Sequence, residues 1–454
     1  MRSLAFTLAA TALLSSVSFG ASQESISAMN RDSTSSHGEQ FQVQSAAERE
    51  ALQDLAKRAE AELRGNILPF WLEHARDVED GGFHGEISGK KKVRSGAPKG
   101  ALLSSRILWT FSAAHRRFQD RAYLAMARHA YDDLESRFWD EEHGGVFWSV
   151  KANGRPQETR KQIYAQVFAL YGYSEYFRAT GDRHALDRAI KLFRLVEAHA
   201  YDPVQGGYFE AFERDWTELE EGTKSLMATP EPKSQNTMLH VMEAYTNLLR
   251  VWPDAELRSR LAELVDRMVT RVVDPKTNHL HLLMAADWSP RSDGISYGHD
   301  IEFSWLLAEA VEVLGDRESE KRMQPVSLAI ARVTRAEGFD SDGGLFNEAD
   351  PHGLTDAGKD WWPQAEAVVG FLNAYQLSGD AEFLGTARRS WRYIESRIVD
   401  RENGEWFWGR DEKGRVPPKR PKAGMWKCPY HNGRACLEVI DRVEKLLGES
   451  PVAK

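Results

Sequence analysis

The chain has 454 residues, of which 42% are hydrophobic and 28% are charged, and its formal net charge is −9. This composition is ordinary for a globular protein and excludes disorder over the bulk of the chain. The acidic balance argues against nucleic acid or an anionic membrane as a partner. The 14 tryptophans indicate either a large core or a surface that stacks on sugar rings.

The first 20 residues have the pattern of a secretory signal peptide. Arg2 supplies the positive charge, Leu4 to Val17 is an apolar run, and Ser18-Phe19-Gly20 offers a cleavage site. The run is too short for a membrane span, and no later stretch reaches the roughly 18 apolar residues that a span needs. Residues 21–44 are rich in Ser, Gln and Glu and are predicted to form a flexible leader. We therefore expect an exported protein, periplasmic or secreted, with no membrane attachment after the signal is removed.

Glycine-containing turns recur along the rest of the chain with a period of about 61–63 residues. A sixth turn is expected near Asn278-His279-Leu280, because 137 residues separate Gly206 from Gly343, about two periods. The five visible turns are Asp80-Gly81-Gly82-Phe83, His143-Gly144-Gly145-Val146, Gln205-Gly206-Gly207-Tyr208, Asp342-Gly343-Gly344-Leu345 and Asn403-Gly404-Glu405-Trp406.

The segments between these turns have helical periodicity and room for two helices each. Thr180-Gly181-Asp182 and Ser378-Gly379-Asp380 resemble matched helix ends, with Gly in the left-handed position that follows a helix. Six helix pairs predict an all-α fold, a single (α/α)6 barrel over residues 45–450 with short β-hairpin-like Gly-Gly turns. An open solenoid is the alternative, and closure is favoured because six units occur without polar capping repeats.

Polar residues inside apolar helical stretches are the candidates for chemistry. His299 and Glu302 are three residues apart, which puts them on one helical face. A lone histidine in such a helix is usually a satisfied core residue, but these candidates recur about one repeat apart, which predicts one level of neighbouring inner helices. The candidates are Arg106, His240, His299, Glu302, Glu366 and His431.

Metal chemistry has little support in the sequence. A His299–Glu302 pair falls short of the three protein ligands that a catalytic zinc needs, and no HExxH motif occurs. Cys428 and Cys436 are too few for a cysteine cage or a disulfide framework; they either pack as thiols or form one disulfide. We expect no metal and no cofactor.

Four segments resemble the cellobiose 2-epimerases of the N-acylglucosamine 2-epimerase superfamily, and the likeness runs from about residue 50 to 445. They are Lys99–Ser112, Tyr297–Glu302, Lys359–Glu366 and Trp426–His431. The resemblance implies an (α/α)6 barrel, in agreement with the repeat count. It also implies a reaction: inversion of C2 in the reducing-end sugar of a β-1,4-linked disaccharide, glucose to mannose, through an enediolate. Cellobiose, lactose and mannobiose are the expected substrates, the last linking the enzyme to mannan degradation.

The resemblance also assigns roles. His299 and His431 match the family's two catalytic histidines and are expected on opposite faces of the intermediate, where an unperturbed pKa around 6.5 suits a base. Glu302 would orient and charge-tune His299. His240 and Arg106 would polarise the O1/O2 region of the sugar, with Glu366 as a further hydrogen-bond partner. The expected substrate-binding residues are Trp362, Trp426, Asn236 and Trp361.

Other functions remain open at this point. A monosaccharide 2-epimerase or an aldose–ketose isomerase of the same superfamily would share the enediolate. A glycoside hydrolase on the same barrel would need two carboxylates flanking the scissile bond. A glycan-binding protein without catalysis would also explain the tryptophans. We expect the protein to be a monomer.

Overall fold

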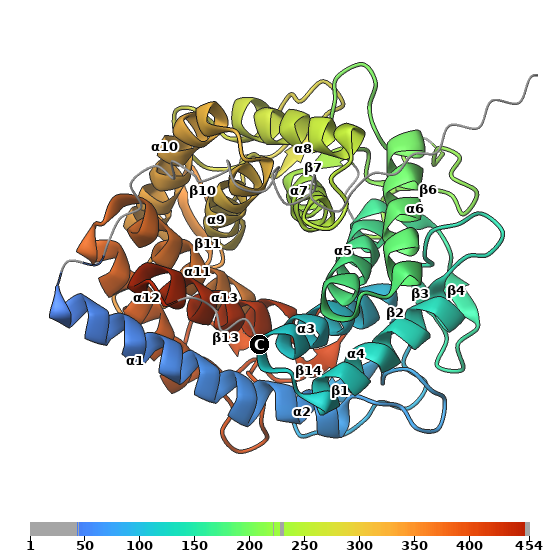
Figure 1. Ribbon diagram of the computed structural model, residues 1–454, viewed down its shortest axis with the longest axis horizontal. Helices are drawn as coiled ribbons and strands as arrows, with labels where there is room; N and C mark the ends of the chain where they lie inside the picture. The colour runs from blue at the N-terminus through green and yellow to red at the C-terminus, as the bar shows by residue number, and fades with distance from the viewer. Residues whose placement is uncertain (1–42, 44, 221, 228–230, 450–454) are drawn as a thin grey trace, which may run out of the picture. The chain divides into compact units, whose positions relative to one another are not determined.

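The structure is a computed structural model that describes residues 43, 45–220, 222–227 and 231–449. The predicted signal peptide and nearly all of the predicted leader lie outside these residues. In the described part, the helices form two concentric rings, an inner ring around the barrel axis and an outer ring that surrounds it (Figure 1). The predicted (α/α)6 barrel is therefore confirmed.

Inner and outer helices alternate along the chain. The inner helices are α3 (Ala101–Phe118), α5 (Ile163–Thr180), α7 (Gln235–Leu249), α9 (Tyr297–Leu314), α11 (Trp361–Ser378) and α13 (Tyr430–Leu447). The outer helices are α1 (Ala46–Glu62) with its continuation α2 (Leu68–His74), α4 (Arg121–Asp133), α6 (Arg183–His199), α8 (Ala255–Arg267), α10 (Arg317–Val333) and α12 (Ala381–Tyr393). Single π-helical turns follow all outer helices except α6: η1 (Leu63–Ile67), η2 (Leu134–Phe138), η3 (Met268–Val272), η4 (Thr334–Gly338) and η5 (Ile394–Ile398).

Short antiparallel strands join each unit to the next. The strand that enters an inner helix pairs with a strand from the following unit, and β14, which precedes α13, pairs with β1 of the first unit, so that strand pairing closes the ring. Helix α13 also packs against α3. The strands are β1 (Glu86–Ser88), β2 (Lys99–Gly100), β3 (Ser149–Val150), β4 (Pro156–Glu158), β5 (Lys161–Gln162), β6 (Ala211–Phe212), β7 (Lys233–Ser234), β8 (Leu283–Met284), β9 (Ile295–Ser296), β10 (Glu348–Asp350), β11 (Gly353–Asp356), β12 (Lys359–Asp360), β13 (Gly409–Arg410) and β14 (Pro421–Gly424).

Local sequence explains where the helices begin and end. Inner helix α5 ends at Gly181 and α11 at Gly379, both left-handed as predicted. An aspartate caps the next outer helix by accepting hydrogen bonds from its first backbone N–H groups, as Asp182 does for α6 and Asp254 for α8. These caps fix the reversals between the two rings.

The two rings differ in how their surfaces are buried. Outer helix α6 buries one stripe, with Leu186, Ala189, Phe193 and Val196 at helical spacing. Inner helix α11 is buried on nearly every side from Trp361 to Tyr375. A polar side chain on an inner helix therefore needs hydrogen-bond partners from other inner helices. The polar residues of the inner helices accordingly contact one another inside the barrel.

The glycine-containing turns occupy the same place in all six units, and the turn between Phe339 and Leu345 is one residue shorter than the others. Each forms an isolated antiparallel bridge across the turn, and the predicted sixth turn does so between Val273 and Leu280. Asn278 takes the left-handed conformation there, with φ of 61°, where other units use glycine. In five of the units described, a buried lysine from the strand before or near the inner helix binds the aspartate that starts the turn. The pairs are Lys99–Asp77, Lys161–Asp140, Lys233–Asp202, Lys359–Asp340 and Lys422–Asp400.

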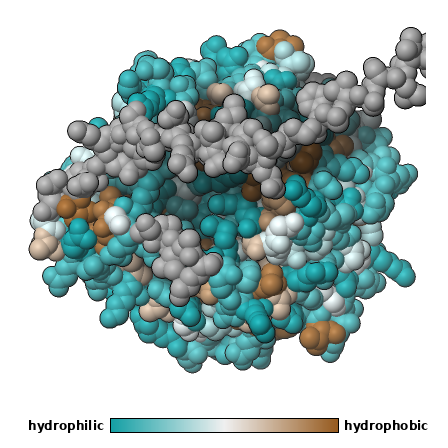
Figure 2. Space-filling model, viewed as in Figure 1, coloured by the Kyte–Doolittle hydropathy of each residue, from teal (hydrophilic) through white to brown (hydrophobic). Residues whose placement is uncertain are grey.

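Cys428 and Cys436 are both buried free thiols, so the packed-thiol alternative holds for them. Among the described residues, no helix combines the length and the apolar character that crossing a membrane requires. The face of the barrel in Figure 2 is largely hydrophilic and is hollowed near its centre.

Candidate active site

Each inner helix begins after a short strand, so the first two turns of the inner helices lie at the barrel end that carries the strands. Arg106, His240, Glu302 and Glu366 are each the sixth residue of their inner helices, α3, α7, α9 and α11. This shared register explains why residues one repeat apart lie at one level of the barrel. The prediction that the candidates recur at equivalent positions on neighbouring inner helices is met for these four. It is wrong for His299 and His431, which are the third residue of α9 and the second of α13, about one turn nearer the start of their helices.

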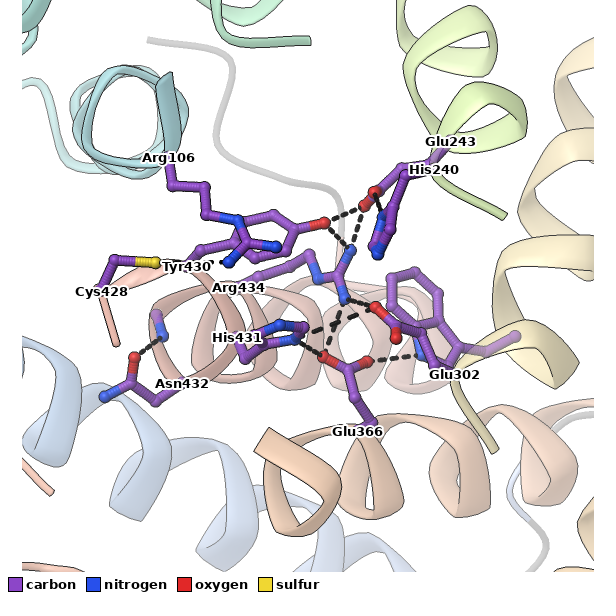
Figure 3. A network of polar contacts seen from close by, with 12 residues as sticks. Arg106, His240, Glu243, Glu302, Glu366, Cys428, Tyr430, His431, Asn432 and Arg434 are labelled. Carbon is purple, nitrogen blue, oxygen red and sulfur yellow. Dashed lines mark hydrogen bonds and ion pairs between the residues drawn. The ribbon is translucent and has the colours of Figure 1, made fainter. Parts of the chain in front are cut away.

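Arg434 of α13 lies at the centre of the polar network (Figure 3). Its guanidinium donates to Oε1 of Glu302 at 2.5 Å and to Oε1 of Glu366 at 2.8 Å. It also donates to Oε1 of Glu243, which accepts a further hydrogen bond from the Tyr430 hydroxyl. One buried cation thus faces three buried carboxyl groups, and burial makes each uncompensated charge costly.

The three carboxyl groups respond to this crowding in different ways. Burial raises the pKa of Glu302 well above its usual range, and the neighbouring Glu366 raises it further. Burial also raises the pKa of Glu366, although Arg434 opposes the shift. Burial acts in the same direction on Glu243, but Arg434 and His240 override it and lower its pKa to about 2. Glu243 is therefore the carboxyl group that carries a negative charge, whereas the pKa values of Glu302 and Glu366 are both shifted toward the protonated form.

Two of the histidines have their protonation pattern fixed by a glutamate. Nδ1 of His431 lies 2.7 Å from Oε1 of Glu366, and Nδ1 of His240 lies 2.8 Å from Oε2 of Glu243. A neutral ring facing a carboxylate donates its Nδ1–H, which leaves the Nε2 lone pair as the basic position. Both rings therefore present Nε2 away from their glutamate.

His299 is held by its own strand and by a tryptophan. Its Nδ1 is 2.8 Å from the hydroxyl oxygen of Ser296, the residue before α9. Its ring lies 4.6 Å from the ring of Trp362, and the same tryptophan lies 5.6 Å from the ring of His431 (centroid to centroid). Trp362 thus contacts both histidines that the family resemblance assigns as bases.

The histidine pKa values differ from the expected value near 6.5. Burial lowers the pKa of His299 to about 3, with His240 adding to the shift. Burial, together with Arg106 and Arg434, lowers the pKa of His431 well below its usual range. The pKa of His240 is lowered too, because desolvation outweighs the attraction of Glu243. All three rings are neutral at neutral pH, the state in which a histidine accepts a proton.

Arg106 forms a second cationic group in an aromatic surround. It donates to the Tyr164 hydroxyl at 2.7 Å, and its guanidinium lies 4.2 Å from the centre of the Phe168 ring and 5.0 Å from that of Tyr430. The Nε atom of Arg106 is buried without a hydrogen-bond partner among the described residues. An unsatisfied buried donor of this kind is available to a ligand.

Glu302 is not the partner of His299 that we expected. Although the two residues share a face of α9, Glu302 turns to Arg434, and its Oε1 is 3.9 Å from Nδ1 of His431. The stronger attraction of a buried carboxyl group to a guanidinium explains the difference. Its other oxygen, Oε2, is buried with no partner in the described part of the chain.

The substrate-binding candidates divide into two groups. Trp362 is half-buried against His299, and Trp426 is 39% exposed, with its ring 6.2 Å from that of Tyr164. Asn236 has a buried Oδ1 without a partner among the residues described. Trp361 is different: its ring is 4.6 Å from that of Trp408 and it is 3% exposed, so it packs in the core and the structure does not bring it to the site.

Sequence reasoning missed Glu243, Arg434 and the two tyrosines, Tyr164 and Tyr430. The signal for the first two was available, because Glu243 follows His240 by three residues and Arg434 follows His431 by three. That is the same spacing that selected Glu302 from His299, and it places each pair on one helical face. The tyrosines carried no comparable signal among many buried aromatic residues.

Glu302, Glu366 and His431 lie close enough to hold a metal ion, since one donor atom from each falls within 4.8 Å of the others. However, the Oε1 atoms of both glutamates already accept hydrogen bonds from Arg434. A guanidinium in this position supplies the positive charge that a cation would bring. The donor set therefore fits an arginine-centred network better than a metal centre.

Chemically, the site combines neutral bases with fixed cations on buried side chains. Two Nε2 lone pairs, on His240 and His431, can accept a proton, and Arg106 and Arg434 can stabilise developing negative charge. Such preorganised donors act most strongly where water is excluded. Such a set of bases and cations is suited to removing a proton next to a carbonyl group and returning it.

Comparison with known proteins agrees with this chemistry. The family model of N-acylglucosamine 2-epimerase (GlcNAc 2-epimerase) matches residues 81–435. The cellobiose 2-epimerase of Bacteroides fragilis is 44% identical over 387 residues, which cover 85% of this chain and 98% of the relative. The cellobiose 2-epimerase of Dictyoglomus turgidum is 40% identical over 382 residues, which cover 84% of this chain and 97% of the relative. The solved structure of cellobiose 2-epimerase from Bacillus thermoamylovorans B4167 has 39% identity and a TM-score of 0.81, covering 86% of this chain and 100% of its own. The chain therefore belongs to the N-acylglucosamine 2-epimerase family and is a carbohydrate epimerase, an isomerase.

Proposed function

We propose that this protein inverts C2 of the reducing-end sugar of β-1,4-linked disaccharides and so interconverts glucose and mannose units. The observation that carries the proposal is the pair His299 and His431, one half-buried and one buried ring of lowered pKa that contact the same tryptophan, Trp362. The similarity to enzymes named cellobiose 2-epimerase supports a disaccharide such as cellobiose, lactose or mannobiose.

The reaction begins when the sugar ring opens and exposes an aldehyde at C1. One of the two histidines removes the C2 proton, and the electron pair of the broken C–H bond moves into the enediolate. The other histidine takes up a proton from solvent and gives it to C2 from the opposite face, which inverts the centre. The first histidine releases its proton to solvent before the next turnover. Only protons move, so the reaction needs no cofactor.

The cations and carboxyl groups support the two proton transfers. Arg106 stabilises the enediolate oxygens, as donors aimed at developing charge do. His240, whose Nδ1–H faces Glu243, takes up a proton at Nε2 from a sugar hydroxyl of the O1/O2 region and returns it there. Glu366, hydrogen-bonded to Nδ1 of His431 at 2.7 Å, can take or supply the proton that the ring gains or loses. Glu302, whose pKa burial raises, holds a further proton beside the same ring.

The second sugar of the disaccharide needs a surface of its own. Trp426 is suited to this because it is partly exposed and lies near Trp148 and Tyr164. A flat indole face buries the apolar C–H surface of a sugar with little loss of side-chain entropy. Asn236, whose buried Oδ1 lacks a protein partner among the described residues, can accept from a sugar hydroxyl.

Incubation of the purified protein with cellobiose, lactose and mannobiose in D2O, followed by NMR of the products, tests the proposal. We expect the C2 epimer, with deuterium at C2. A ketose as the main product would instead assign an aldose–ketose isomerase, and released monosaccharide a hydrolase. Binding without deuterium at C2 would assign a glycan-binding protein.

Export is part of the same proposal. We propose that residues 1–20 direct the protein out of the cytoplasm, that cleavage after Gly20 leaves Ala21 as the first residue, and that the mature protein is a monomer. N-terminal sequencing of protein recovered outside the cytoplasm tests the first point. An intact Met1 on the active enzyme would contradict it, and light scattering gives the mass in solution.

A further inference from the structure

One of the six units connects its turn to its inner helix in a different way. In five units described above, a buried lysine binds the aspartate of the turn. In the unit of α8 and α9, the equivalent strand position in β9 is Ile295, and no lysine is available from it. The buried basic residue at this turn is His279, which stands where four of the other turns have their second glycine.

The inner helix of this unit is also unusual at its fourth residue. In α5 and α11 that residue is a glutamine, Gln166 or Gln364, whose amide both accepts from and donates to the backbone of the turn. In α9 it is Asp300, which accepts from the backbone N–H of Leu280 at 2.9 Å. A carboxylate can only accept hydrogen bonds, so it cannot donate one to the turn as the glutamines do. The contact between the turn at Leu280 and the first turn of α9, called the joint below, therefore needs a donor from another residue.

His279 supplies that donor and faces a second carboxylate. Its Nδ1 lies 2.7 Å from Oδ2 of Asp300, and its Nε2 lies 3.1 Å from Oε2 of Glu337 in η4. Only the protonated imidazolium can donate from both nitrogens at once. The charged and titratable groups that face the ring are Asp300 and Tyr297 from α9 and Glu337 from η4.

The joint lies directly beside the catalytic candidate His299. Asp300 is the next residue, in the first turn of α9. This turn has no free space on its other side, because a Cβ atom at Gly298 would come within 2.5 Å of the Trp362 ring. A shift of the first turn of α9 would therefore change the contact between His299 and Trp362.

We propose that His279 is a positioning residue: its imidazolium ties the turn at Leu280 to the first turn of α9 and so holds His299 against Trp362, and loss of the imidazolium proton at alkaline pH loosens this joint. The activity readout of this inference rests on the proposed function, whereas its spectroscopic readouts do not. The electrostatics of the site support this role. Burial lowers the pKa of His279, but the attraction of Asp300 and Glu337 outweighs it and raises the pKa above 6.5. The stabilisation is thus complete below pH 6.5 and is lost as the pH rises through the raised value.

NMR of the histidine rings in the full-length protein provides the first test. We expect the His279 ring to stay protonated above pH 6.5, its usual value, and to lose its proton at lower pH in a Glu337→Gln variant. The His299 ring signals report its position against Trp362 and should shift together with the titration of His279, but not in His279→Gln. Titration of His279 at or below its usual pH, or His299 signals that ignore it, would overturn the inference.

Activity provides the second test. For His279→Gln we expect kcat on cellobiose to fall about tenfold near neutral pH, because a displacement of a functional group by about 1 Å can cost up to about 10²-fold. KM should change little, and the decline of the wild-type kcat at alkaline pH should disappear. His281→Gln, two residues along the same turn, is the matched control and should keep the wild-type profile. A His279→Gln variant with lower thermal stability but an unchanged pH profile would reduce His279 to a structural residue. Absence of epimerase activity in every variant, with the NMR shifts present, would refute the proposed function and leave the joint intact.

Discussion

Nδ1 of His431 and Oε1 of Glu366 are 2.7 Å apart, in a part of the barrel where both side chains are buried. Glu366 comes from α11 and His431 from α13, so the contact exists only because the barrel brings neighbouring inner helices together. It fixes the Nδ1–H tautomer and directs the Nε2 lone pair away from the glutamate. The two predictions that follow depend on this geometry.

Replacement of Glu366 by Gln should lower kcat by at least about 10²-fold, because an amide can present its N–H₂ to Nδ1 and reverse the tautomer of His431. KM should change less than kcat. Steady-state epimerisation of cellobiose measures both constants. Glu382→Gln, on the surface of α12, is the control and should behave as wild type. A Glu366→Gln variant with wild-type kcat would show that catalysis does not depend on the Nδ1–H tautomer of His431.

Replacement of His299 or His431 by Ala should each lower epimerisation by about 10²–10⁴-fold, the usual contribution of a positioned acid or base. The two variants should still differ in D2O. Each retains one base, so each should exchange the C2 hydrogen of only one epimer with solvent. NMR of cellobiose and of its epimer measures this exchange, and circular dichroism should confirm that the barrel is intact. Near wild-type turnover in either variant would contradict the assignment of two bases.

The lowered histidine pKa values predict an acid-tolerant enzyme. Because burial lowers the pKa of His299 to about 3 and that of His431 well below its usual range, both rings stay neutral as the pH falls through 6.5. We therefore expect kcat/KM, which reports the free enzyme, to show no acid limb at that pH. Measurement of kcat/KM between about pH 7 and pH 5 tests this. A decline centred at pH 6.5 would mean that the bases are solvated.

The same shift has an opposite consequence for stability. The unfolded chain takes up a proton on His299 as the pH falls below 6.5, whereas the folded chain does so only near 3. The contribution of this group to stability is therefore lost as the pH falls through that window. Urea unfolding of wild type and of His299→Asn should diverge in slope against pH, with the variant less sensitive to acid. Parallel curves would contradict the low pKa.

Much of the fold was predictable because its determinants are local. The turns require left-handed residues, and glycine at such positions, or Asn278 with φ of 61°, leaves a visible period. The site was predictable only in part, because its partners come from different units. Glu302 shares a face with His299, yet it binds Arg434, which is 132 residues away in sequence. The pKa shifts depend on burial, which exists only once the ring has closed.

Arg434 should be a residue on which the folded state depends. Arg434→Met would leave Glu243, Glu302 and Glu366 without their shared cation, and the loss of one partner of a buried ion pair costs about 3–5 kcal/mol. Urea unfolding measures the change in free energy. Lys445→Met, which removes a surface pair with Glu312 from the same helix, is the control and should cost about 1 kcal/mol or less. Equal effects of the two changes would show that the network does not stabilise the fold.

The tryptophans near the site distinguish a disaccharide enzyme from a monosaccharide enzyme. Trp362 contacts both candidate bases and Trp426 is 39% exposed, whereas Trp361 packs on Trp408. Replacement of Trp362 or Trp426 by Ala should cost about 1–3 kcal/mol in transition-state binding of cellobiose, the scale of one well-packed aromatic contact. Trp361→Ala should instead lower stability, with kcat/KM per folded molecule little changed, and so serves as the control.

Free glucose should be a poor substrate of the wild type, because it cannot use the binding energy of a second sugar subsite. A Trp426→Ala variant should therefore lose efficiency on cellobiose but not on glucose. Equal kcat/KM on glucose and cellobiose for the wild type would refute the disaccharide assignment and favour a monosaccharide epimerase or isomerase.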